Sequence, residues 1–162
     1  MTHNLHKPLR HLLLAVSLAW TAIATHAAAP LPLSLGVSYD RSIKSHQNGY
    51  GFQLTADLGS RFRLQPEFIY LTEHAGVATL QLNLNAHWRV PLFDSFGIYP
   101  LAGLSYSHWG YDGPNASRWG MNAGCGAEYT FGSRITLFTE VRLLVVSHET
   151  QPIYTAGLKY HL

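Results

Sequence analysis

Apolar and polar residues alternate with a period of two along most of the chain after residue 30. The alternation is clearest in residues 80–90, where Leu82, Leu84 and Trp88 share one face and Asn83 and Asn85 share the other. Successive side chains of a β-strand project to opposite faces, so this period predicts strands. Eight strands and no helix are predicted after residue 30, at residues 33–40, 50–58, 62–70, 80–90, 98–107, 120–130, 135–145 and 154–162.

The predicted connections alternate in length. Those at residues 59–60, 91–95 and 131–133 are short, whereas those at residues 41–48, 72–76, 109–117 and 147–152 are mostly longer and polar. Outer-membrane barrels have short periplasmic turns and longer external loops. If the first strand begins in the periplasm, all three short connections fall on the periplasmic side. The sequence therefore predicts an eight-stranded antiparallel up-and-down transmembrane β-barrel.

The first 29 residues have the organisation of a secretory signal peptide. A basic segment with Lys7 and Arg10 precedes the apolar residues 12–24, and small residues follow. This order matches the basic, apolar and cleavage regions of a signal, and the apolar run is too short to span a bilayer as a helix. Cleavage is expected after Ala24 or Ala27, within the range 24–29. Residues 30–162 then form the barrel domain.

Composition excludes several other classes of protein. Charged residues make up 12% of the 162 residues, which is about half the share in a typical soluble domain. The single cysteine, Cys125, excludes an intramolecular disulfide framework and a cysteine-rich zinc module. Without Lys7 and Arg10 the formal charges of the chain balance. No nucleic-acid partner and no cofactor are expected.

Membrane and soluble barrels share this alternation but differ in which face meets the solvent. A soluble lipocalin-like carrier points its apolar face inward. Here the polar face is mainly Gly, Ser, Thr, Asn and Gln, which suits a crowded interior better than a water-exposed surface. Aromatic residues mark both ends of the apolar face, as at a membrane interface. They are Phe62, Trp88, Tyr129 and Tyr160 at one end, and Tyr50, Tyr70, Tyr106 and Tyr154 at the other. The membrane barrel is predicted, with the soluble periplasmic carrier of an apolar ligand as an alternative.

Two stretches carry a family resemblance: WGMNAGCGAEYTFGSRITLFTEVRLL at residues 119–144 and YTAGLKYHL at residues 154–162. Together with the signal and the eight strands, they make residues 31–162 resemble the outer-membrane beta-barrel superfamily. That superfamily includes the barrel of outer-membrane protein A, the small adhesion and invasion barrels, and the porin-like opacity proteins. The resemblance implies a monomer in a Gram-negative outer membrane, inserted by the barrel-assembly machinery. Its partners would be membrane lipid, lipopolysaccharide and an extracellular surface partner.

Charged residues on the polar face are predicted to pair inside the lumen, because an isolated buried charge is costly. The predicted network is Arg63, Glu67, Arg89, Glu128, Glu140, Arg142 and Lys159, with Asp57 and His87 on the same face. Pairing among Glu128, Glu140, Arg142 and Lys159 on the last three strands would plug the lumen. A fixed network that only specifies the fold is the favoured interpretation. The resemblance to outer-membrane protein A implies the alternative, a gate that opens when these charges change partners.

Four of the ten histidines lie at the predicted external rim, one in each loop: His46, His74, His108 and His148. The carboxylates Asp40, Glu73, Asp112 and Glu149 lie near them in the sequence. Imidazole and carboxylate groups suit zinc, copper or nickel, so a metal site is a hypothesis for this rim. Solvated loop histidines are the favoured interpretation.

The function expected from the sequence is non-enzymatic, with an envelope-structural, surface-interaction or narrow gated-permeation role. The alternative enzyme resembles the outer-membrane lipid A deacylases, which are similar in size and use Ser, His and Glu with a His-x-Ser strand motif. That motif is absent from the sequence. Ser147, His148 and Glu149 have the right residue types, but adjacent residues of a strand point to opposite faces. No catalytic residue is therefore predicted.

Overall fold

The structure, a computed structural model, describes residues 31–74, 76–111, 116–147 and 149–162. The predicted signal peptide lies outside the described residues. The described residues form nine strands: β1 (Leu33–Ser42), β2 (Asn48–Asp57), β3 (Phe62–His74), β4 (Val77–Trp88), β5 (Val90–Pro91), β6 (Phe96–Tyr111), β7 (Ala116–Phe131), β8 (Ile135–Val146) and β9 (Glu149–His161). None of the described residues belongs to a helix long and apolar enough to cross a membrane.

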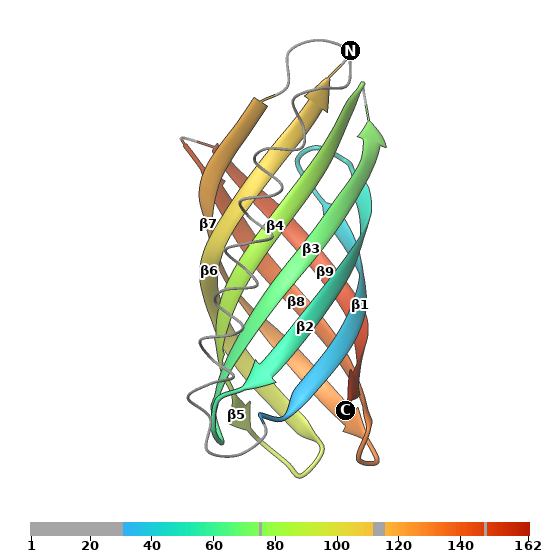
Figure 1. The fold of residues 1–162 in the computed structure, drawn as a ribbon, viewed down its shortest axis with the longest axis vertical. Coiled ribbons are helices and arrows are strands. Elements are labelled where there is room, and N and C mark those ends of the chain that lie inside the picture. Colours follow the sequence, from blue (N-terminus) through green and yellow to red (C-terminus); the bar gives the residue numbers. More distant parts are fainter. Residues whose placement is uncertain (1–30, 75, 112–115, 148) are drawn as a thin grey trace. The chain divides into compact units, whose positions relative to one another are not determined.

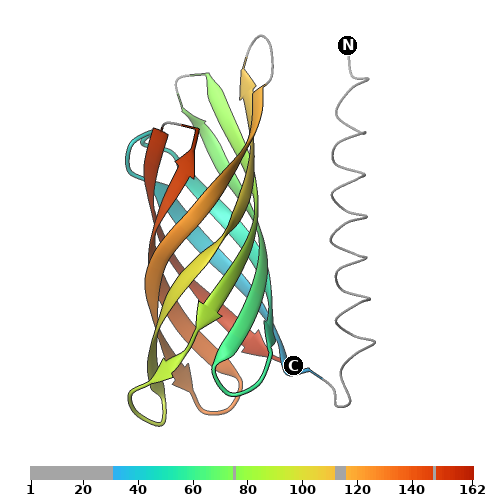
Figure 2. The same cartoon turned by 90° about the vertical axis from the view of Figure 1, so that its left-hand side faces the viewer.

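The strands of residues 32–162 close into an antiparallel barrel (Figures 1 and 2). The order runs β4-β3-β2-β1-β9-β8-β7-β6, and pairing between β4 and β6 closes the ring. The short β5 pairs with β6 in the register that β4 has already set, since His87 opposes Leu101 and Val90 opposes Ile98. β4 and β5 are therefore one interrupted strand, and the barrel has the predicted eight strands.

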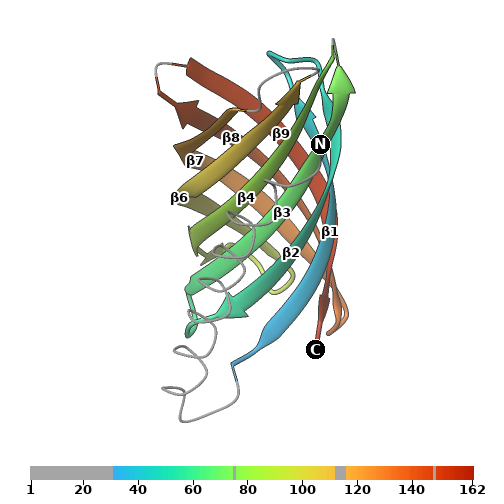
Figure 3. The same cartoon turned by 45° about the horizontal axis from the view of Figure 1, so that its top comes forward.

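The polar face of the sheet points into the barrel. Gln81 and Asn85 are almost completely buried, whereas Leu84 and Trp88 on the same strand are 48% and 50% exposed. Tilted strands wrap around one axis (Figure 3), so alternate residues of each strand share the interior. A soluble carrier needs the opposite arrangement, which makes the lipocalin-like alternative wrong. Cys125 is exposed on the outer, apolar face, as expected.

Aromatic side chains stand in register on the outer face near both ends of the barrel. Phe62 opposes Trp88 at the end near the chain's C-terminus, and Tyr50 opposes both Tyr39 and Tyr70 at the other end. The Tyr39 and Tyr50 rings meet edge to face with centroids 6.1 Å apart. Rings of this kind suit the headgroup level of a bilayer.

The connections between strands lie at the two ends of the barrel. The connections at residues 58–61, 92–95 and 132–134 form the inner end. The outer end is where β1, β3, β6 and β8 finish and β2, β4, β7 and β9 begin. The outer end is the one predicted to face the cell exterior. The predicted excess in length of the outer connections is wrong, because the strand ladders continue to pairs such as Trp109–Ala116 and Val146–Glu149. Polar residues near strand ends, such as Ser117 and Arg118, resemble loop sequence, although they belong to the β6–β7 ladder.

Glycines inside the barrel make room for two large aromatic side chains. A Cβ atom on Gly126 would lie 2.5 Å from the Tyr99 ring, and one on Gly157 would lie 2.6 Å from the Phe138 ring. Both rings are almost fully buried in the lumen. Eight strands leave little interior space, so each inward ring depends on a glycine beside it.

The exposed apolar belt predicts a position-dependent response to charge. Leu84→Arg places a guanidinium near the middle of a lipid-facing strand and is expected to lower the free energy of unfolding by about 2–4 kcal/mol in phospholipid vesicles. Phe93→Arg, in an exposed inner-end connection, is the control and should change it by less than about 1 kcal/mol. Urea titrations followed by tryptophan fluorescence measure both values. Equal, small effects would contradict a lipid-facing Leu84.

Candidate functional site

The middle of the lumen contains a buried ion cluster around Arg142. Arg142 on β8 donates one Nη to Glu67 on β3 and the other, at 3.1 Å, to Asp40 on β1. Glu140 on β8 lies 3.9 Å from the guanidinium. Thr155 Oγ1 donates to Asp40 at 2.6 Å. Three carboxylates from three strands thus surround one arginine, and all four charged side chains are fully buried.

A second ion cluster fills the lumen nearer the inner end. Arg63 donates to Asp57 and to Glu128, each at 2.7 Å. Arg89 donates Nε to Glu128 at 2.9 Å and lies 3.7 Å from Asp57. Lys159 lies 3.9 Å from Glu128. Glu128 therefore faces three cations, and the cluster links β2, β3, β7 and β9 across the lumen.

Aromatic side chains occupy the space between the two clusters. Tyr99 donates its hydroxyl to Glu140 at 2.8 Å, and His87 stacks on the Tyr99 ring with centroids 4.8 Å apart. Lys159 Nζ lies 4.5 Å from the centroid of Phe138, within range of a cation–π contact. The charged and aromatic layers therefore follow one another along the axis.

The structure places all seven residues of the predicted charge network in the lumen, but their strongest contacts differ from those expected. Lys159–Glu128 and Arg142–Glu140 are both 3.9 Å apart. The closer partners come from the other side of the barrel, such as Arg63 for Glu128.

The position of Asp40 differs from the one expected from the sequence. It was expected among the rim histidines, but it lies in the lumen as a partner of Arg142, because β1 continues to Ser42 and its even-numbered positions face inward. Extending the alternation of residues 34, 36 and 38 by one step would have found it.

An apolar layer at the outer end of the lumen was missed by the sequence reasoning. Leu144, Val146 and Ile153 form a buried cluster, and Trp109 packs against it. All four occupy inward positions of β6, β8 or β9. Leu144 gave a signal, because it and Phe138 are the two apolar residues on the predicted inward face of their strand. The other three lay at the margins of predicted strands or in predicted loops.

The rim histidines lie at different places. The rings of His46 and His74 have centroids 6.3 Å apart, and His108 Nδ1 is 2.7 Å from Ser117 Oγ. His148 lies outside the described residues. Within the described part of the chain, no three His, Cys, Asp or Glu side chains are arranged to hold a metal ion.

A polar, ion-paired interior inside an apolar, aromatic-edged exterior defines a transmembrane β-barrel. The chain belongs to the family of the outer membrane protein beta-barrel domain, which matches residues 12–161. It is an outer-membrane protein. No curated protein matches the sequence.

Similar solved structures share this fold. The N-terminal beta-barrel domain of Pseudomonas aeruginosa OprF is 15% identical, with a TM-score of 0.71, and the match covers 81% of this chain and 97% of that one. Neisserial surface protein A is 11% identical with a TM-score of 0.62, covering 80% and 94%. Ail of Yersinia pestis is 10% identical with a TM-score of 0.59, covering 82% and 97%. At these identities the likeness concerns the fold alone.

Removing the arginine of the central cluster is expected to be costly. Arg142→Met leaves buried carboxylates without their cation and should lower the free energy of unfolding by about 3–5 kcal/mol. Adding Asp40→Asn and Glu67→Gln to Arg142→Met should restore most of the loss, because fewer unpaired charges remain. Lys44→Met, which removes the exposed ion pair with Glu149, is the control and should cost less than about 1 kcal/mol. Urea unfolding in vesicles measures all three, and equal losses for Arg142 and Lys44 would refute this role.

Proposed function

We propose that this protein is a non-enzymatic outer-membrane barrel whose lumen is closed to ions and whose outer end serves interactions at the cell surface. The observation that carries this proposal is the succession of side-chain layers in the lumen. The Arg63 cluster, the Tyr99 and Phe138 rings, the Arg142 cluster and the Leu144 layer follow one another from the inner to the outer end. An ion would have to displace each layer in turn.

A surface role is supported by the way the strands extend toward the outer end. β6 and β7 are 16 residues long, whereas a strand needs about 9–11 residues to cross the hydrocarbon core. The additional residues hold the outer end clear of the bilayer, where a partner could reach it. Ail, a barrel of the same fold, has been solved in complex with the heparin analogue sucrose octasulfate. Membrane lipid and lipopolysaccharide would contact the apolar belt of the folded monomer, and the barrel-assembly machinery would insert it.

A non-enzymatic role is supported by the surroundings of two Ser–His contacts. Ser34 Oγ lies 2.9 Å from His161 Nδ1, but the other ring nitrogen meets Thr136 rather than a carboxylate. Ser117 Oγ likewise lies 2.7 Å from a ring nitrogen of His108, Nδ1. Among the described residues no carboxylate hydrogen-bonds to either imidazole. A nucleophile and base without a third group to orient the base lack the usual catalytic arrangement.

Narrow, gated permeation is a second candidate, favoured by one feature of the central cluster. Arg142 lies between Glu67, to which it donates, and Glu140, whose Oε2 has no hydrogen-bond partner among the described residues. Transfer of the guanidinium from Glu67 to Glu140 would pull its side chain away from β3 without leaving it unpaired. Such a transfer could open a transient passage through this layer.

Planar-bilayer recordings test whether the lumen is closed, as in the first candidate, or gated, as in the second. The wild-type protein should add no steady conductance, because paired charges and apolar side chains fill its lumen. Glu67→Gln should produce brief openings if Arg142 can move to Glu140. The double variant with Glu140→Gln is the matched control and should stay closed. Steady conductance of the wild type would overturn the closed barrel, and a closed Glu67→Gln variant would remove the gated alternative.

A further inference from the structure

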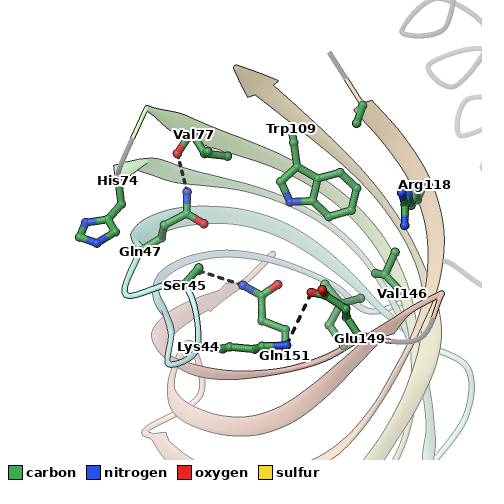
Figure 4. A pocket seen from close by; sticks show the side chains of 12 residues that line it. Lys44, Ser45, Gln47, His74, Val77, Trp109, Arg118, Val146, Glu149 and Gln151 are labelled. Atoms are coloured by element: carbon green, nitrogen blue, oxygen red, sulfur yellow. Dashed lines mark hydrogen bonds and ion pairs between the residues drawn. The ribbon is translucent and has the colours of Figure 1, made fainter. Parts of the chain in front are cut away.

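The outer end of the barrel holds a cavity of about 490 Å³ (Figure 4). Side chains from β3, β4, β6, β7, β8 and β9 and from the connection at residues 43–47 surround it. Its size is within the range of pockets that bind small molecules, about 300–1,000 Å³. It opens away from the ion clusters, at the end predicted to face the cell exterior.

The floor of this cavity is apolar. Leu144 and Val146 line it together with Trp109, and they belong to the buried cluster that also contains Ile153. These residues point inward, so contact with membrane lipid does not explain why they are apolar. Apolar side chains that line a concave site with a few polar groups are the usual lining of a ligand pocket.

Two glutamines on the cavity wall are held in place by the surrounding protein. Gln47 donates its amide to the backbone oxygens of Val77 and Thr72, at 2.7 and 3.2 Å. Gln151 donates to Ser45 Oγ at 2.9 Å. Figure 4 shows both amides at the edge of the same hollow. A ligand would therefore meet side chains that are already ordered, which lowers the entropy cost of binding.

The charges at the mouth favour an anion. Lys44 and Glu149 pair with each other at 3.6 Å at the rim, where the neighbouring strands β1 and β9 meet. Arg118 on β7 donates to Ser147 Oγ at 3.3 Å, and no carboxylate of the described residues forms an ion pair with it. Among the described residues that line it, Lys and Arg thus exceed Asp and Glu by one, above a floor that suits an apolar group.

We propose that this cavity binds a small amphiphile with an apolar body and a single anionic head group, such as a medium-chain carboxylate. The apolar body packs against Trp109, Leu144 and Val146, and the head group lies beside Arg118. The central ion cluster beneath the floor stops the ligand at the mouth. This site goes beyond the proposed surface role, and its binding titration can fail independently of the conductance recordings.

Calorimetric titration with octanoate tests the proposal. The full-length mature protein is placed in lipid nanodiscs, because detergents are themselves amphiphiles and would compete. Octanoate should bind saturably at one site per barrel. Butyrate should bind roughly a hundredfold more weakly, because it buries fewer methylene groups. Octyltrimethylammonium should bind roughly tenfold more weakly because its charge is of the wrong sign. Empty nanodiscs correct for partition into lipid.

Two variants are expected to change the affinity for octanoate in opposite directions. Arg118→Gln should weaken octanoate binding about fivefold, whereas Glu149→Gln should strengthen it, since it removes a like charge and frees Lys44. Arg61→Gln, an exposed arginine at the inner end, is the matched control and should change nothing. Heat-dependent gel mobility verifies that each variant is folded.

Three outcomes would overturn the proposal. One is octanoate uptake equal to that of empty nanodiscs. Another is equal affinity for octanoate and octyltrimethylammonium. The third is an Arg118→Gln protein that is folded and binds octanoate as the wild type does.

Discussion

Hydrocarbon offers the polypeptide backbone no hydrogen-bond partner, and the whole structure follows from that constraint. An open sheet would leave two edges of unpaired N–H and C=O groups in lipid. Here β1 pairs with β9 and β4 pairs with β6, so the ladder runs around the ring without an edge. Closure also fixes the two faces, because alternate residues of every strand must enter the interior. The alternation of apolar and polar residues along the sequence therefore follows from the closure of the barrel.

A closed ring of eight strands has a narrow interior, which determines how its charges are arranged. Charges there cannot be surrounded by bulk water, so each needs a partner from a facing strand. Arg142 obtains its partners from β1 and β3, and Glu128 obtains cations from β3 and β9. Small residues elsewhere on the inward face leave the volume that these long side chains occupy. Charge pairing and glycine placement are therefore two aspects of the same packing problem.

The sequence sufficed for the strands, the faces and the position of Cys125, because these depend on local alternation alone. Sequence-based prediction failed where the alternation is interrupted, and where a contact joins residues that are far apart in the sequence. Near the strand ends polar residues interrupt the alternation, so Trp109 and Val146 were not assigned to the interior, although both belong to the apolar layer at the outer end. The partners of Arg142 are separated from it by 75 and 102 positions. No pattern along one strand can identify such a pair, since it depends on the register of several strands around the ring.

The layers of the lumen differ in how they resist ions, and the difference matters for any gate. A charged layer can be opened by exchange of partners, because the arginine remains paired throughout. The layer of Leu144, Val146 and Ile153 has no partner to exchange, and in the proposed closed lumen it would exclude ions because wetting an apolar constriction is unfavourable. Re-pairing at Arg142 alone would therefore extend the polar lumen only as far as this layer. Conduction requires the apolar layer to wet as well, so two independent changes must coincide, and openings would be rare and brief. The same layer that would restrain conduction forms the floor of the outer cavity, which links the proposed closed lumen to the shape of the outer surface.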